Sequence, residues 1–267
     1  MASNDPRHRD RKTRPARAAY SMRALGKAGL PDVIHLQGND YRLVRSVKHD
    51  FFAATGFYAD AQGRRVVLKI SRTEEFAGVP LVWLGRWLCQ REQRFYRKLE
   101  DLPEIPKVLG AVGETGFVLQ HVEGYPLARN SPIPDGFFQK LQRLLCELHR
   151  RGLAYVDTNK TQNILVGADG RPHLVDFQIS WDLEELGPWK LNRLWLRHLQ
   201  KEDLYHILKH KRRCRPDELS PVERRMSRRR SALLRVHRFI LWPYFRLRRR
   251  TFQRLRDTGR LSPEGSK

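Results

Sequence analysis

Three oxygen-bearing side chains in the middle of the sequence have the types and spacing for magnesium-nucleotide chemistry. Asp157, Asn163 and Asp176 lie in the stretch from Leu148 to Ser180, each beside an apolar run. Such runs, broken by turn residues, predict one compact strand-turn-strand unit that carries all three side chains. Carboxylate and amide oxygens are groups that Mg²⁺ accepts together with phosphate oxygens. The unit therefore predicts a site for a magnesium-bound nucleotide.

Two elements upstream carry one charged residue each. Val66 to Ile70 reads VVLKI, a β-strand pattern interrupted by Lys69. Leu84 to Glu100 has the period of an amphipathic helix, and Glu92 lies beside its apolar stripe, where it can face inward. Alone, Lys69 would be interpreted as a solvated residue on an edge strand and Glu92 as a surface charge. Their order ahead of the three oxygen-bearing residues favours a joint role instead.

In this order, the five residues resemble the catalytic apparatus of the protein-kinase-like fold. The resemblance implies that Lys69 grips the α- and β-phosphates of ATP and is held by Glu92. It also implies that Asn163 and Asp176 carry Mg²⁺, while Asp157 orients an acceptor hydroxyl for in-line attack. ATP and Mg²⁺ are thus the expected cofactors.

The same resemblance assigns the adenine side of the site. Gly116 to Val122 reads as an apolar strand that leads into a hinge, where the backbone of Gln120 and Val122 would contact adenine. Phe137 to Arg151 has apolar residues at helical spacing and is followed by Gly152, a common helix terminator. This segment is expected to be the buried helix that delivers the catalytic loop.

The phosphate-binding hairpin departs from the kinase pattern. No GxGxxG precedes Lys69, and the candidate hairpin from Val47 to Tyr58 has only Gly56. A backbone nest built from residues 53 to 56, with Thr55 and Gly56 as nucleotide contacts, is the expected replacement.

The catalytic and metal motifs are also altered. Tyr155 stands where a typical kinase has histidine, and the loop from Asp157 to Asn163 is one residue longer than usual. Gln178 replaces the glycine that ends the metal motif, and its β-carbon disfavours positive φ, so a freely flipping segment is not expected. Lys160, inside the loop, is either a solvated residue or a group that neutralises the transferred phosphoryl.

The departures point to the trimmed relatives of protein kinases. No Ala-Pro-Glu follows Asp176, and only 91 residues remain after it (267 − 176), too few for a full peptide-docking lobe. The chain looks most similar to the lipopolysaccharide kinases that phosphorylate Kdo or heptose, and then to RIO-type kinases. The resemblance covers about Leu43 to Trp195. It implies an α+β, two-lobed fold with a small β-rich N-lobe and a reduced helical C-lobe.

Length and charge divide the chain into one domain with two tails. The 267 residues are enough for one two-lobed domain, predicted over residues 31–215, with the lobes meeting at about residues 122 and 123. Residues 1–30 are basic and poor in apolar surface, which predicts a disordered tail. Residues 216–267 are predicted to form a basic amphipathic extension.

The net charge of +23 suggests partners for that extension. From residue 228 to residue 256, arginines alternate with aromatic and aliphatic residues, a pattern typical of anionic membrane headgroup regions. The same residues could instead pack on the C-lobe with their arginines solvated. Nucleic acid is a further partner that arginine clusters allow, although no known nucleic-acid motif accompanies them.

The sequence also indicates a compartment. The first thirty residues have no apolar core of a secretion signal, and the longest apolar run, Phe239 to Phe245, is far shorter than the ~20 residues of a bilayer span. Cys89, Cys146 and Cys214 have no paired spacing and are interpreted as reduced, buried or inert. A cytoplasmic protein, peripheral on the inner membrane face, is expected.

Three functions compete on this basis. The first is a kinase that phosphorylates a hydroxyl of a glycolipid or lipopolysaccharide-type sugar. The second is a RIO-like kinase that acts on a ribonucleoprotein or protein. The third is a pseudokinase that serves as a basic binding module, which the missing glycine loop favours and the five retained residues disfavour.

Overall fold

The structure is a computed structural model that describes residues 20, 22–76 and 78–228. These residues form two compact units. The first holds the described residues up to Arg91 together with Leu109–His121, and the second holds Glu92–Val108 and the described residues from Val122 onward. The predicted membrane or nucleic-acid segment from residue 229 onward lies outside the described residues. Among the described residues, no helix is long and apolar enough to span a bilayer.

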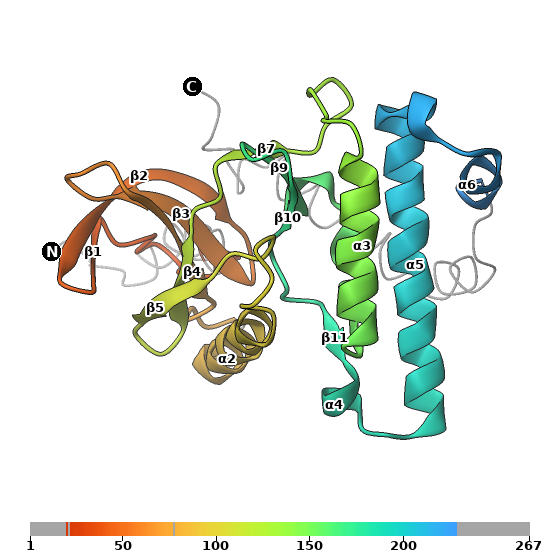
Figure 1. The fold of residues 1–267 in the computed structure, drawn as a ribbon. Helices are drawn as coiled ribbons and strands as arrows, with labels where there is room; N and C mark the ends of the chain where they lie inside the picture. The colour runs from red at the N-terminus through yellow and green to blue at the C-terminus, as the bar shows by residue number, and fades with distance from the viewer. Residues whose placement is uncertain (1–19, 21, 77, 229–267) are drawn as a thin grey trace, which may run out of the picture. The chain divides into compact units, whose positions relative to one another are not determined.

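A six-stranded antiparallel sheet dominates the first unit (Figure 1). Its strands, in spatial order, are β1 (Val33–Leu36), β2 (Asn39–His49), β3 (Ala53–Ala59), β4 (Arg65–Ser71), β6 (Gly116–Gln120) and β5 (Val108–Val112). The predicted VVLKI strand is confirmed as β4, which pairs on both sides and is therefore a central strand. One face carries a buried cluster made by Ile34, Leu36, Tyr41, Tyr58, Val66, Leu68 and Val118.

The prediction that residues 1–30 form a disordered tail does not hold for residues 22–30. Ala24 is fully buried, its amide donates to the carbonyl of Asp50 at 2.8 Å, and its carbonyl accepts from the amide of Thr73 at 2.9 Å. A small side chain such as that of Ala24 can pack beside the sheet with little apolar surface. The end of the basic stretch 1–30 can therefore be ordered. This segment supports the turn between β2 and β3.

Helix α2 (Val82–Lys98) is the predicted helix, shifted by two residues from the expected bounds. It approaches the chain after β4 at Gly85, where an added β-carbon would lie 1.9 Å from the carbonyl oxygen of Arg72. Glycine is the one residue that permits this contact. Glu92 lies on the part of α2 that belongs to the second unit.

The second unit is built on two long helices that run side by side in opposite directions (Figure 1). They are α3 (Phe137–Arg150), which confirms the predicted buried helix, and α5 (Lys190–Cys214). Gly152 adopts φ 75° and its amide donates to the carbonyl of His149 at 3.0 Å, as expected of a helix terminator.

Short elements complete this unit. They are the sheet of β7 (Gly124–Pro126), β9 (Ile164–Gly167) and β10 (Pro172–Leu174), the pair β8 (Leu153–Ala154) and β11 (Trp181–Asp182), and helix α4 (Leu183–Leu186). Two 3₁₀ turns, η2 (Asp157–Asn159) and η3 (Thr161–Asn163), join β8 to β9.

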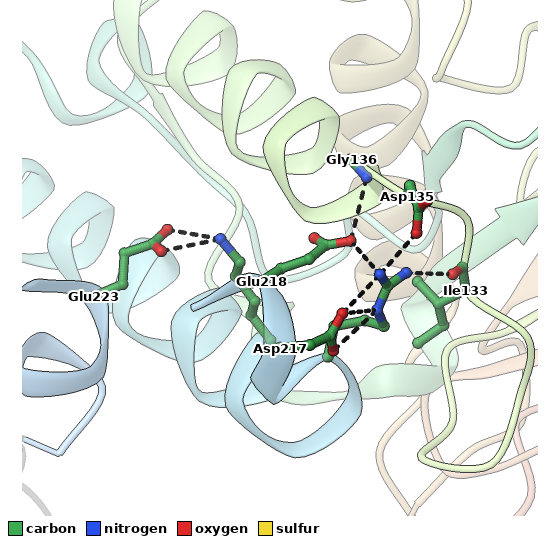
Figure 2. Close-up of polar contacts among 8 residues, drawn as sticks. Ile133, Asp135, Gly136, Asp217, Glu218 and Glu223 are labelled. Carbon is green, nitrogen blue, oxygen red and sulfur yellow. Dashed lines mark hydrogen bonds and ion pairs between the residues drawn. The ribbon is translucent and has the colours of Figure 1, made fainter. Parts of the chain in front are cut away.

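The described chain continues past residue 215 in contact with α5. Arg215 binds Asp135, at 2.7 Å, and Glu218, at 2.9 Å, and so ties the segment before α3 to the end of α5. Lys211 pairs with Glu223 at 2.9 Å, and Figure 2 shows both sets of contacts. The elements that follow α5 are η4 (Pro216–Glu218) and α6 (Pro221–Met226).

Candidate active site

The predicted catalytic loop between β8 and β9 holds Asp157 in a fixed position. Its carboxylate oxygen Oδ2 accepts hydrogen bonds from Lys160 Nζ and Asn163 Nδ2, each at 2.7 Å. The loop makes two successive 3₁₀ turns that meet at Lys160, which accommodates the additional residue noted in the sequence. Lys160 is the ion-pair partner of Asp157, and its side chain is also 53% exposed, in agreement with the solvated alternative.

The surroundings of Asp157 raise the pKa of its carboxyl above the ordinary value. Burial is the largest cause, and the negative charge of Asp176 adds to it, while Lys160 and Asn163 oppose the shift. A carboxylate with a raised pKa is a stronger base. This carboxylate is therefore suited to accept a proton from a hydroxyl group.

The backbone around the loop is strained at two positions. Val156 has φ 68° and Asp176 has φ 67°, whereas Gln178 is not among the described residues with positive φ. A β-branched residue with positive φ is a genuine outlier, and such strain persists only where the surroundings impose it. Gln178 thus avoids positive φ, as its β-carbon predicts, and the positive φ of this segment lies two residues earlier, at Asp176.

Asp203 of α5 imposes the conformation of the loop. Its fully buried carboxylate accepts from the amides of Tyr155, at 2.9 Å, and Val156, at 2.8 Å. It also accepts from Thr158 Oγ1 at 3.1 Å and contacts His149 Nε2 at 3.2 Å. The sequence analysis missed this residue. Its one local signal is an acid on the apolar face of a helix, beside Ile207.

Tyr155, which replaces the histidine of typical kinases, joins the loop to the strand before Asp176. The side chain is completely buried, and its hydroxyl donates to the carbonyl of Val175 and lies 3.3 Å from the carbonyl of Asn163. Burial and the charge of Asp176 hold the pKa of Tyr155 well above its usual value. The hydroxyl therefore stays protonated and acts as a hydrogen-bond donor.

Phe177 anchors the residue that is expected to bind metal. Its ring lies 5.0 Å from Tyr96, 5.1 Å from Tyr155 and 6.3 Å from Phe95, measured between ring centroids. The Tyr96 hydroxyl accepts a hydrogen bond from the Asp176 amide at 2.9 Å. Aromatic packing thus fixes the backbone on both sides of the Asp176 side chain.

Asn163 and Asp176 form a donor set that suits Mg²⁺ bound through phosphate oxygens. Because Asn163 donates its amide nitrogen to Asp157, its amide oxygen is the atom left for a cation. The amide of Val175, next to Asp176, donates to the Asn163 carbonyl at 3.1 Å, which keeps the two residues together. One amide and one carboxylate fit Mg²⁺, which completes its shell with water and phosphate. Among the described residues, no cluster of three His, Cys, Asp or Glu could hold a metal by itself.

Lys69 lies in the middle of the sheet of the first unit and not on an edge. It is 5% exposed, stands opposite Thr55 of β3 and Phe117 of β6, and alternates with Leu68, which faces the apolar cluster. A buried ammonium group requires compensation by a partner. Glu92, which is 1% exposed, belongs to the second unit, and its pairing with Lys69 stays a prediction.

The predicted backbone nest at residues 53–56 is wrong. These residues lie in β3, where β4 pairs with all four of them and β2 pairs with Ala54, Thr55 and Gly56, so their backbone runs as a sheet strand and not as a nest. Gly56 is buried under Leu30 and Leu43, whose methyl carbons would lie 2.7 and 2.9 Å from an added β-carbon. Core packing by itself favours glycine at this position, and a contact of Gly56 with nucleotide stays a prediction. Thr55 stays a predicted contact, because it shares a sheet face with Lys69.

The turn between β2 and β3 already contains a negatively charged side chain. The Asp50 carboxylate accepts hydrogen bonds from the amides of Phe52, at 2.9 Å, and Ala53, at 3.0 Å. Burial opposes ionisation, but Lys48 and these amides lower the pKa of Asp50 below its ordinary value. A negative charge therefore occupies the amides that a phosphate would use.

Two further expectations have different outcomes. Gln120 is the last residue of β6 and faces Val66 across the sheet, while Val122 begins the second unit, and their contact with adenine stays a prediction. The three cysteines are free thiols: Cys89 is buried, Cys214 is half-buried and Cys146 is exposed.

Comparison with solved structures identifies the fold. The chain is similar to the Rio2 kinase from Chaetomium thermophilum in complex with ADP, Mg²⁺ and phosphoaspartate, with a TM-score of 0.52 and 20% identity. The match covers 67% of this chain and 57% of that one. A second structure of Rio2 kinase from the same organism gives a TM-score of 0.49 and 19% identity, over 69% and 62% of the two chains. No protein-family model and no curated protein matches the chain.

The predicted α+β protein-kinase-like fold is therefore confirmed, with its likeness to RIO-type kinases. The chain spans less than two thirds of the length of the Rio2 chain that it matches. The likeness to lipopolysaccharide kinases stays a prediction.

Proposed function

We propose that the protein is an ATP- and Mg²⁺-dependent phosphotransferase. The observation that carries the proposal is the buried Asp157 carboxylate, held by Lys160 and Asn163 in a loop whose strained backbone is anchored by Asp203. A binding module has no need of a base kept at a raised pKa. The ADP and Mg²⁺ bound to the Rio2 kinase support the same cofactors here.

In the proposed reaction, Asp157 takes the proton of an acceptor hydroxyl as its oxygen attacks the γ-phosphorus of ATP. The bond from that phosphorus to the bridging oxygen breaks, and ADP leaves. Lys160 would neutralise charge on the transferred group, and Lys69, with Glu92 as its predicted partner, would grip the α- and β-phosphates. Bound Mg²⁺ would supply further charge neutralisation through Asn163 and Asp176.

We propose as acceptor a hydroxyl of a glycolipid or lipopolysaccharide-type sugar at a membrane surface. The basic composition of the chain supports an anionic acceptor. A cytoplasmic protein on the inner membrane face would fit this acceptor.

A second candidate comes from the phosphoaspartate in the similar Rio2 structure. A RIO-like protein would carry the phosphoryl group on an aspartate or act on a ribonucleoprotein. Acyl phosphates are cleaved by hydroxylamine, whereas sugar phosphate esters are not. The chemical stability of the labelled product therefore separates the two candidates.

The test is phosphate transfer from labelled ATP to total lipid, lipopolysaccharide core sugars, RNA-protein fractions and generic protein. Asp157→Asn should lower the rate by about 10²- to 10⁴-fold with nucleotide binding kept, because it removes only the base. Asp176→Asn should abolish turnover and weaken Mg-ATP binding. The matched control is Asp169→Asn in the β9–β10 turn, which should transfer at the parent's rate. Parent-like rates in both active-site variants would refute the assignment, and no transfer to any acceptor would favour the pseudokinase.

A further inference from the structure

The first turns of α5 and the residue at its N-cap, Trp189, expose large apolar side chains. Trp189 and Leu191 are each 75% exposed, Leu194 is 60% exposed and Trp195 is 39% exposed. We call these four residues the α5 docking face. Isolated exposed apolar residues are ordinary, but a set gathered on adjacent turns of one helix indicates a binding surface.

The docking face is exposed because α5 extends past α3 at this end. The N-terminal end of α5 extends beyond the end of α3, as Figure 1 shows. The inward side of this segment is covered, since Leu196 is buried. Leu191, Leu194 and Trp195 follow the i, i+3, i+4 spacing of a single helix face and point away from that core.

Basic side chains flank the docking face. Lys190, Arg193 and Arg197 are all exposed, and among the described residues none of them pairs with a carboxylate. The combination of tryptophan, leucine and lysine or arginine on one helix end is typical of segments that lie in a membrane interface.

The acidic residues nearest in sequence do not cancel this charge, because they are paired elsewhere. Asp182 and Glu184 both bind Lys98, each at 2.9 Å, and Glu185 pairs with Arg94. The start of α5 therefore keeps its positive charge.

We propose that the α5 docking face binds an anionic lipid surface. Charge complementarity favours lipid over a second copy of this chain or its own segment from residue 229 onward, because both are strongly basic. A projecting helix end also suits the flat surface of a bilayer, into which tryptophan and leucine insert while arginines meet phosphate headgroups. This surface is distinct from the predicted C-terminal membrane segment.

The proposal deepens the proposed function, since it would bring a lipid-borne acceptor to the enzyme, but its evidence is independent of phosphotransfer. A chain that binds vesicles through α5 yet transfers no phosphate would refute the proposed function alone. Active enzyme without vesicle binding would refute this inference alone.

The test is co-sedimentation of the full chain with phosphatidylcholine vesicles, with and without phosphatidylglycerol. Trp189→Ser combined with Leu194→Ser should weaken binding to the acidic vesicles by about tenfold or more, because two large apolar groups are lost. Arg193→Ser and Arg197→Ser should each weaken it by about fivefold at low salt. The matched control is Trp83→Ser combined with Trp87→Ser on α2, whose tryptophans are 63% and 53% exposed. It should bind as the parent does.

Circular dichroism and nucleotide titration establish that each variant is folded. Equal binding by the parent and the Trp189/Leu194 variant would overturn the proposal, as would an equal loss in the α2 control. The proposal would also be overturned if the unmutated chain did not bind vesicles but bound poly-glutamate through these residues. That result would favour an acidic protein as the partner.

Discussion

The β2–β3 hairpin and the catalytic loop are both expected to contact ligand, yet they are held in opposite ways. In the hairpin, backbone groups pair within the sheet, and the carboxylate of Asp50 takes the amides of the turn. In the loop, side chains of Asp203 and Tyr155 hold the backbone outside regular structure. The difference teaches that, in these two regions, positioned side chains hold the loop, whereas the backbone amides of the hairpin turn are already engaged by Asp50.

The largest effect is expected where the loop is anchored. Asp203→Ala removes the acceptor of two amides and one hydroxyl in a buried place, so the free energy of unfolding should fall by about 3 kcal/mol or more. Urea unfolding measures this loss. In the protein that remains folded, the transfer rate should drop more than nucleotide affinity, because the loop carries Asp157.

Asp203→Asn is the conservative comparison, since it keeps one acceptor oxygen and should recover part of the stability and the rate. If Asp203→Ala unfolds at the parent's urea concentration, the loop is held by something other than Asp203.

A moderate effect is expected from Gly56→Ala in the β2–β3 hairpin. This variant tests whether the hairpin contributes packing and not phosphate binding, in contrast to the loop. The added methyl meets Leu30 and Leu43, so the free energy of unfolding should fall by about 1–3 kcal/mol through overpacking. Nucleotide affinity of the folded variant should stay unchanged. The opposite result, weaker nucleotide binding at unchanged stability, would restore Gly56 as a phosphate-loop glycine.

The smallest effect concerns pH. The pKa of Asp157 in the folded protein lies above its ordinary value, so the folded state binds more protons than the unfolded state between the two values. Stability therefore falls as pH rises through this window. Asp157→Asn cannot ionise, and its free energy of unfolding should fall less than the parent's between acid and neutral pH. Parallel curves for the two proteins, measured by urea unfolding across pH, would contradict the raised pKa.

Elements with a regular period were predictable from sequence. Strand β4, helix α3 and, within two residues, helix α2 follow from local apolar spacing alone. Asp157, Asn163 and Asp176 share one small unit because short-range connections between adjacent strands bring them there.

Features that depend on distant contacts were not predictable. Asp203 meets the loop from 45 to 48 residues away, so nothing beside it in sequence reveals its partner. Gly56 was interpreted as a phosphate-loop glycine because the side chains that cover it, Leu30 and Leu43, come from other segments. Residues 22–30 were assigned to a tail because the average charge and apolar content of this stretch are set by its basic neighbours. One buried alanine does not change that average. The pairing of Lys69 with Glu92 stays a prediction.

The enclosure of Phe177 limits how far the backbone beside Asp176 can move. Three rings surround it, and only three residues separate it from β11. Rotating this ring out of place would forfeit several aromatic contacts of about 0.5–1.5 kcal/mol each, in addition to its burial. We therefore expect Phe177, and with it the backbone of Asp176, to keep the described conformation whether or not a ligand is bound.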